Sequence, residues 1–233
     1  MKIRFLLEIA VETVEAAEAA ERAGADRIEL CEDLHVGGIT PPGALLEATR
    51  KKVRIPIFVM IRPRAGDFVY STAEFEEMKV AIAAAKRAGA DGIVLGVLTH
   101  GALVDSKRTR ELVSLSNPLP VTFHRACDET TDLPQAMEDV IQTGATRILT
   151  SGGDKTALEG MTTIARLVAA AAARIIIVPG AGINPQNISQ IVTTTRAREF
   201  HSGLSSTLPY PRGDHHRFQE EIRKLIASLK SNC

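Results

Sequence analysis

The stretch AGADRI at residues 23–28 recurs as AGADGI at residues 88–93 and as TGATRI at residues 143–148. In each copy we expect a helix to end, a Gly to make the turn, and a short apolar strand to begin. Short β-branched runs alternate with longer Ala-, Glu- and Arg-rich runs along the rest of the chain as well. Near-continuous apolar runs of this kind are typical of a parallel sheet that is covered on both faces. The expected strands are residues 3–11, 27–31, 55–61, 92–98, 120–124, 147–150, 174–178 and 199–201.

The amphipathic segments between these strands are predicted to be helices. Ser71 and Glu74 fit a capping box, and Asp132 with Pro134 gives an N-cap followed by Pro in the first turn. Eight strands that alternate with helices predict one (β/α)8 TIM-barrel domain of residues 1–233, and a doubly wound open sheet is the alternative. The expected helices are residues 13–23, 71–89, 106–115, 132–144, 157–172, a segment that begins at 184, and 214–229.

Composition excludes several classes of protein. Lys and Arg number 28, as do Asp and Glu, so the formal charge is zero and gives no general attraction to nucleic acid or an anionic membrane. The odd number of three cysteines argues against a disulfide scaffold. The N-terminal apolar run is short and interrupted at Glu8, which is unlike a signal peptide, and no apolar run is long enough to span a membrane. We therefore expect a cytoplasmic protein with no nucleic-acid or membrane partner.

Polar residues gather where the predicted strands end. A TIM barrel carries its site at these C-terminal ends, so such residues are expected to converge at the mouth. Carboxylates and imidazoles there could act as general acids and bases on a small ligand. A structural layer of buried ion pairs is the alternative, because buried carboxylates and guanidinium groups need partners. The candidate catalytic residues are Glu8, Glu29, Arg62, His124 and His201.

Gly- and hydroxyl-rich loops follow the later strands, where TIM barrels commonly bind phosphate. Tight turning alone is the other explanation for these glycines. The loops would suit an isomerase, lyase or hydrolase that acts on a small anionic or phosphorylated substrate, and no organic cofactor is indicated. The candidate anion-binding residues are Arg64, Ser151, Gly152, Gly180, Gly182 and Ser202.

Several of these motifs together resemble the CutC copper-homeostasis family. The resemblance runs from about residue 7 to residue 201, with a C-terminal loop and helix at 202–233. It implies a cytoplasmic TIM barrel that handles copper, with Cu(I) bound at the mouth. The motifs that carry it are GADRIELC at 24–31, GGITP at 37–41, VMIRPRAGDFVY at 59–70, PVTFHRACD at 120–128, LTSGG at 149–153, ALEG at 157–160 and EFH at 199–201.

The sequence departs from the family pattern at three positions. Ala10 stands where the first strand of the family has a cysteine, which is one of two thiols proposed there for copper, and Cys31 matches the other. Cys127 replaces a Phe, and Ala181 replaces a Gly. Cys31 is therefore the candidate metal ligand, and Cys127 is a weaker one.

Cu(I) prefers thiolate and thioether donors and accepts imidazole. The donors available near the mouth are Cys31, Cys127, Met60 and His124. We expect the terminal Cys233 to have no role. A third interpretation is a non-catalytic, homo-oligomeric binding protein, for which the Ala-rich stretch 168–173 offers a packing face.

Overall fold

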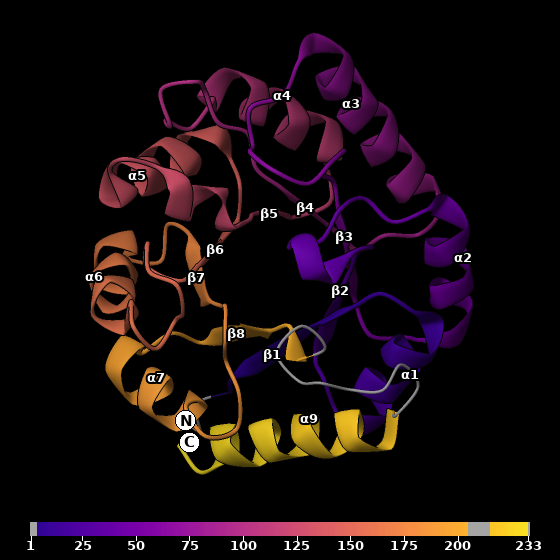
Figure 1. Ribbon diagram of the computed structural model, residues 1–233, viewed down its shortest axis with the longest axis vertical. Coiled ribbons are helices and arrows are strands. Elements are labelled where there is room, and N and C mark those ends of the chain that lie inside the picture. The colour runs from indigo at the N-terminus through magenta and orange to yellow at the C-terminus, as the bar shows by residue number, and fades with distance from the viewer. Residues whose placement is uncertain (1–3, 205–214, 233) are drawn as a thin grey trace.

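The computed structural model of the protein describes residues 4–204 and 215–232. Parallel strands form the inner wall of a barrel, and helices surround it (Figure 1). The hydrogen-bonded order is β7-β6-β5-β4-β3-β2-β1-β8, so β7 and β8 are the two ends of one nearly closed sheet. The predicted TIM barrel is confirmed. The strands are β1 Leu6–Val11, β2 Arg27–Leu30, β3 Ile57–Met60, β4 Gly92–Leu95, β5 Val121–Phe123, β6 Arg147–Thr150, β7 Ile176–Pro179 and β8 Glu199–Ser202.

The helices around the barrel bury small and aliphatic residues against the strands. The last of them, α9, lies across the outside of β1 and β8 between α7 and α1 (Figure 1). Among the described helices, none combines the length and the apolar character needed to cross a bilayer. The helices are α1 Val14–Ala23, α2 Gly43–Lys52, α3 Thr72–Arg87, α4 Ser106–Ser116, α5 Leu133–Thr143, α6 Met161–Ala171, α7 Ile188–Thr195 and α9 His215–Lys230, with 3-10 turns η1 Leu34–Val36 and η2 Arg125–Glu129.

The recurring motif, AGAD in two copies and TGAT in the third, ends a helix with the same turn at each place. Its glycines, Gly24, Gly89 and Gly144, have φ of +99°, +87° and +88°, a left-handed conformation that favours Gly at a helix end. In the two AGAD copies, the Asp then accepts a hydrogen bond from the start of the preceding strand. Asp26 accepts from the Leu7 N–H at 2.9 Å, and Asp91 accepts from the Ile57 N–H at 2.9 Å. In the third copy, the Thr146 hydroxyl instead donates to the Val121 carbonyl at 3.0 Å. The motif therefore fixes both the turn and the register of the next strand.

Most element boundaries follow their predicted signals. The capping box of Ser71 with Glu74 and the N-cap of Asp132 are both present. The predicted strand 92–98 ends earlier, at Leu95, because Leu98 bridges to Val104 in the following loop.

Two helix predictions need correction, and one helix was missed. Helix α6 begins at Met161 rather than 157, and α7 begins at Ile188 rather than 184. Asn184 instead accepts hydrogen bonds from the backbone N–H groups of Gln186 and Asn187, which forms a turn before α7. Helix α2 was not predicted.

Candidate functional site at the mouth of the barrel

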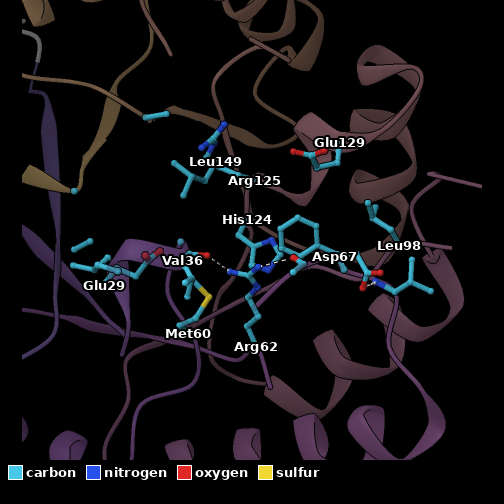
Figure 2. Close-up of a pocket in the computed structure, with 18 of the residues that line it drawn as sticks. Glu29, Val36, Met60, Arg62, Asp67, Leu98, His124, Arg125, Glu129 and Leu149 are labelled. Atoms are coloured by element: carbon cyan, nitrogen blue, oxygen red, sulfur yellow. Dashed lines mark hydrogen bonds between the residues drawn. The ribbon is translucent and has the colours of Figure 1, made fainter. Parts of the chain in front are cut away.

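A pocket of about 610 Å³ opens at the C-terminal ends of the strands, where the sequence predicted a site. Four of the five candidate catalytic residues line it, namely Glu29, Arg62, His124 and His201. In the view of Figure 2, Met60 lies between Glu29 and Arg62, and His124 stands near the centre. Glu8 does not line the pocket.

Glu8 lies beneath the pocket, and strand register brings its partners to it. The register places Glu8 opposite His201 on β8 and opposite Arg27 on β2. Glu8 Oε1 lies 2.7 Å from His201 Nδ1, and Oε2 accepts a hydrogen bond from Arg27 Nε. Burial alone would raise the pKa of Glu8, but the charge of Arg27 and the contact with His201 lower it to about 2. Glu8 is therefore an ionised carboxylate that orients His201.

Arg27 continues this network across the barrel. Its Nη2 donates to Glu199 Oε2 at 2.9 Å, and Glu199 Oε2 also accepts from Arg147 Nε at 3.0 Å. Both guanidinium groups lie over the ring of Phe58, at 4.5 and 5.2 Å from its centroid. The ion-pair layer considered from sequence thus exists, with Glu8 as a member and Arg27 rather than Arg62 as its partner.

Glu29 lies outside this network although it is equally buried. Its Oε2 has no hydrogen-bond partner among the described residues. Burial raises the pKa of Glu29 to about 7, since the opposing charge of His201 only partly offsets it. Burial lowers the pKa of His201, but Glu29 and Glu8 together hold it above its ordinary value. The pocket is therefore lined by a carboxyl group that can exchange a proton near neutral pH, beside an imidazole that Glu8 orients.

His124 is held in the pocket wall as a neutral imidazole. Its Nδ1 accepts a hydrogen bond from the Ala126 N–H at 3.2 Å, and Nε2 is buried with no partner in the described part of the chain. Burial, followed by the charge of Arg62, lowers the pKa of His124 to about 3. The ring fills the space beside Gly96, where a Cβ would lie 2.5 Å from Nδ1. A side chain at residue 96 would therefore clash with the imidazole, so this position needs Gly.

The two terminal nitrogens of Arg62 donate hydrogen bonds to backbone carbonyls of the surrounding loops. Nη1 donates to the carbonyls of Val36 at 3.0 Å and Gly38 at 3.1 Å, and Nη2 donates to Gly66 at 2.8 Å. The guanidinium also stacks on Phe68, 4.8 Å from the ring centroid. Arg62 therefore joins the loops that follow β2 and β3, and these donors are already engaged.

The structure separates the two candidate metal-binding cysteines. Cys31 packs with Met60 in a small cluster inside the barrel, whereas Cys127 belongs to the main core. Cys127 Sγ donates to the Leu149 carbonyl at 3.4 Å, and Cys31 Sγ lies 3.8 Å from the Val11 carbonyl. Burial raises the pKa of both thiols. Cys233 lies outside the described residues.

An internal carboxylate occupies much of the predicted anion-binding loop after β6. Asp128 accepts hydrogen bonds from the Ser151 N–H at 2.9 Å, the Gly153 N–H at 3.1 Å and the Thr150 hydroxyl at 2.5 Å. A Cβ at Gly152 would lie 2.5 Å from the Gly160 carbonyl oxygen, so close backbone packing requires this Gly. The donors that sequence assigned to a ligand here already have a partner in the protein.

The remaining anion-binding candidates are dispersed. Gly182 lines the pocket, but Arg64, Gly180 and Ser202 do not. Arg64 forms ion pairs with Asp67 and Glu74, and the Ser202 hydroxyl donates to the Ile183 carbonyl at 2.7 Å.

Sequence reasoning missed pocket residues that come from loops rather than strand ends. The loop after β3 supplies Asp67 and Phe68, the loop after β4 supplies His100, and η2 supplies Arg125 and Glu129. The segments RAGDF, in the loop after β3, and HRACDE, directly after β5, are the signal that could have pointed to most of them.

Comparison with known proteins gives the family. The sequence model of the CutC family matches residues 5–206. The chain belongs to the CutC family. It is 48% identical over 203 residues to the human copper homeostasis protein cutC homolog. The aligned region covers 87% of this chain and 74% of the human protein. The CutC structure of Streptococcus agalactiae superposes on this CutC-family barrel with a TM-score of 0.80 at 32% identity, covering 85% of this chain and 98% of that one.

A more distant structure shares the fold alone. Phosphoribosylanthranilate isomerase of Thermotoga maritima matches with a TM-score of 0.64 at 15% identity, covering 99% of the CutC-family chain and 100% of its own.

Proposed function

We propose that this protein serves copper homeostasis by binding Cu(I) as its cargo at the floor of the mouth pocket. The soft donors would be the Cys31 thiolate and the Met60 thioether. We further propose that it works in the cytoplasm, where thiols stay reduced and available to a soft metal. Membership of the CutC family supports the copper connection.

The observation that carries this proposal is the close packing of Cys31 and Met60 against Gly38. Gly38 has φ of +82°, and a Cβ there would lie 3.2 Å from Cys31 Sγ and 3.5 Å from Met60 Cε. Both sulfur-bearing side chains therefore pack against the same glycine, and Met60, unlike Cys31, also lines the pocket. A thiolate with a thioether suits Cu(I). The thiol proton must leave for the metal to bind, so affinity should fall as the pH is lowered.

An anaerobic Cu(I) competition titration against a chromophoric chelator tests the proposal. All proteins carry Cys233→Ser, so that the terminal thiol contributes nothing. We expect one equivalent of Cu(I) in this background, at least about tenfold weaker binding in Cys31→Ser, and unchanged binding in the matched control Cys127→Ser. Absence of competition, or equal binding by Cys31→Ser, would contradict the proposal.

A second candidate function is acid–base catalysis on a small anionic substrate, as an isomerase, lyase or hydrolase. Its support is the pairing of Glu29, a pocket carboxyl group without a described hydrogen-bond partner, with His201, which Glu8 orients. The terminal nitrogens of Arg62 are engaged and its side chain is buried. Arg125 donates from Nε to Asp128 and from Nη2 to Ser151, but its side chain is 42% exposed at the pocket wall, so Arg125 is the better anion contact.

Thermal unfolding with inorganic phosphate and with phosphorylated sugars tests this second candidate. We expect a ligand-dependent rise in Tm that Arg125→Ala removes and that Arg174→Ala, an exposed control, retains. No rise with any of these anions would count against it. Sedimentation velocity over a range of protein concentrations tests the third interpretation, a homo-oligomeric binding protein.

A further inference from the structure

We propose that the mouth pocket holds a second metal site, for a divalent transition ion such as Zn²⁺ or Co²⁺, with His201 and Glu29 as direct ligands. The site uses nitrogen and oxygen donors rather than sulfur. It is therefore independent of the Cu(I) proposal, and either one can fail without the other.

The donor atoms already lie together without an ion. Glu8, Glu29 and His201 each offer one atom, and the three atoms lie within 4.8 Å of one another. They come from three neighbouring strands, because Glu8 on β1 pairs with His201 on β8 and Ala10 on β1 pairs with Glu29 on β2. Rigid strands rather than loops therefore set the spacing, as a preorganised metal site requires.

Within this group, Glu8 and His201 have the arrangement of a metal-binding histidine with its supporting carboxylate. A histidine that ligates a metal usually donates its other ring N–H to a carboxylate, which fixes the tautomer and the ring orientation. Glu8 Oε1 lies 2.7 Å from His201 Nδ1, so Nδ1 carries the proton and Nε2 keeps its lone pair. Because Arg27 holds the other oxygen of Glu8, Glu8 acts as a positioning residue for His201.

Glu29 has a buried carboxyl oxygen without a hydrogen-bond partner among the described residues, and this oxygen favours the binding of a cation. Glu29 is 3% exposed, it lines the pocket, and its Oε2 has no hydrogen-bond partner in the described chain. Leaving a buried carboxyl oxygen unpartnered is costly, and coordination to a cation would satisfy it. The network of Glu8, Arg27, Glu199 and Arg147 pairs its own charges, so Glu29 remains to attract a cation.

The same positions favour a borderline divalent ion over other metals. One imidazole with one carboxylate suits Zn²⁺ or Co²⁺ better than Mg²⁺ or Ca²⁺, which prefer all-oxygen sites. Both ligands face an open pocket, so water or substrate oxygens would complete the coordination, as in metal sites that keep a position open.

Titration of Co²⁺ into metal-free protein at pH 7.5, followed by visible absorption, tests the site. The background is again Cys233→Ser. We expect one equivalent of Co²⁺ with d–d bands, displacement of Co²⁺ by Zn²⁺, and no thiolate charge-transfer band in the near ultraviolet. Glu29→Gln, a replacement of the same shape, should weaken Co²⁺ binding at least about tenfold. Cys31→Ser and the exposed control His216→Gln should both bind like the background protein.

Three outcomes would overturn the proposal. These are the absence of one-to-one Co²⁺ uptake, equal uptake by a folded Glu29→Gln variant, and a thiolate charge-transfer band. The last outcome is read on protein with an intact site, so the proposal stays open to disproof even if Glu29→Gln does not fold.

Discussion

The Nδ1 atom of His201 lies 2.7 Å from Oε1 of Glu8, across the strand pair that joins β8 to β1. Through Arg27 this contact continues to Glu199 and then to Arg147 on β6. The hydrogen-bonded sheet ends at β7 on one side and at β8 on the other. The ion pair of Arg147 with Glu199 therefore links β6 to β8, the strands on either side of β7, where the hydrogen-bonded sheet ends. Glu8 thus both orients a pocket imidazole and helps to close the barrel.

Replacement of Glu8 by Gln should destabilise the fold strongly. The change removes the charge that pairs with buried Arg27, and breaking one partner of a buried ion pair costs about 3–5 kcal/mol. Urea unfolding at pH 7 measures the loss. Glu138→Gln is the control, since its pair with Arg174 is exposed and solvent-screened pairs contribute little to stability. Similar losses in the two variants would show that the buried network does not stabilise the barrel.

Asp128→Asn should loosen the loop after β6. Asp128 accepts from the backbone N–H groups of Ser151 and Gly153, and an Asn amide would set N–H groups against these donors. Hydrogen bonds to a charged group contribute about 1.5–3 kcal/mol each, so we expect a loss of about 2–4 kcal/mol in the free energy of unfolding.

The same substitution at Asp132 is the control for Asp128→Asn. Asp132 caps α5, and Asn is an equally good N-cap, so Asp132→Asn should change the stability little. Equal effects of the two substitutions in chemical denaturation would contradict the role given to Asp128.

The stability of the protein should depend on pH through His124. Burial and Arg62 lower its pKa from 6.5 to about 3, so the unfolded chain takes up the proton first as the pH falls. The stabilisation is complete above pH 6.5 and is lost progressively towards pH 3. Between pH 7.5 and pH 5, the protein should lose about 2 kcal/mol more stability than His124→Gln. Denaturant unfolding of both proteins at these two pH values checks this, and equal losses would contradict it.

Much of the fold could be predicted because different sequence signals agreed. The Gly of the AGAD motif adopts the left-handed turn that the pattern predicts. The hydrogen bond from the preceding strand to the Asp was not predicted. Helix α2 was missed because its start carries no capping side chain. Pro42 precedes it, and only Leu46 and Thr49 of the helix are fully buried, which leaves a weak apolar pattern.

The site could be predicted in part only. Strand alternation correctly put Glu29 and Cys31 on the inner face, and the rule for strand ends located the pocket. The partners of these residues depend on register between strands, which the sequence does not state. Arg27 stands at the beginning of its strand, so a search of strand ends passed over the residue that pairs with Glu8. Likewise, nothing local indicated that Arg62 binds loop carbonyls.

Ala181→Gly should stabilise the protein, because Ala181 adopts a conformation that suits Gly. It has φ of +74°, between Gly180 and Gly182 in the loop after β7. A left-handed conformation costs a residue with a Cβ about 1–2 kcal/mol, and the greater freedom of Gly in the unfolded chain offsets part of this. We expect a net gain of about 0.5–1 kcal/mol in denaturant unfolding.

Ala65→Gly is the matched control for Ala181→Gly. Ala65 is exposed in a loop and has no positive φ, so the same change there should lower the stability slightly. A loss of stability in Ala181→Gly equal to that in Ala65→Gly would show that the left-handed loop is not strained by alanine.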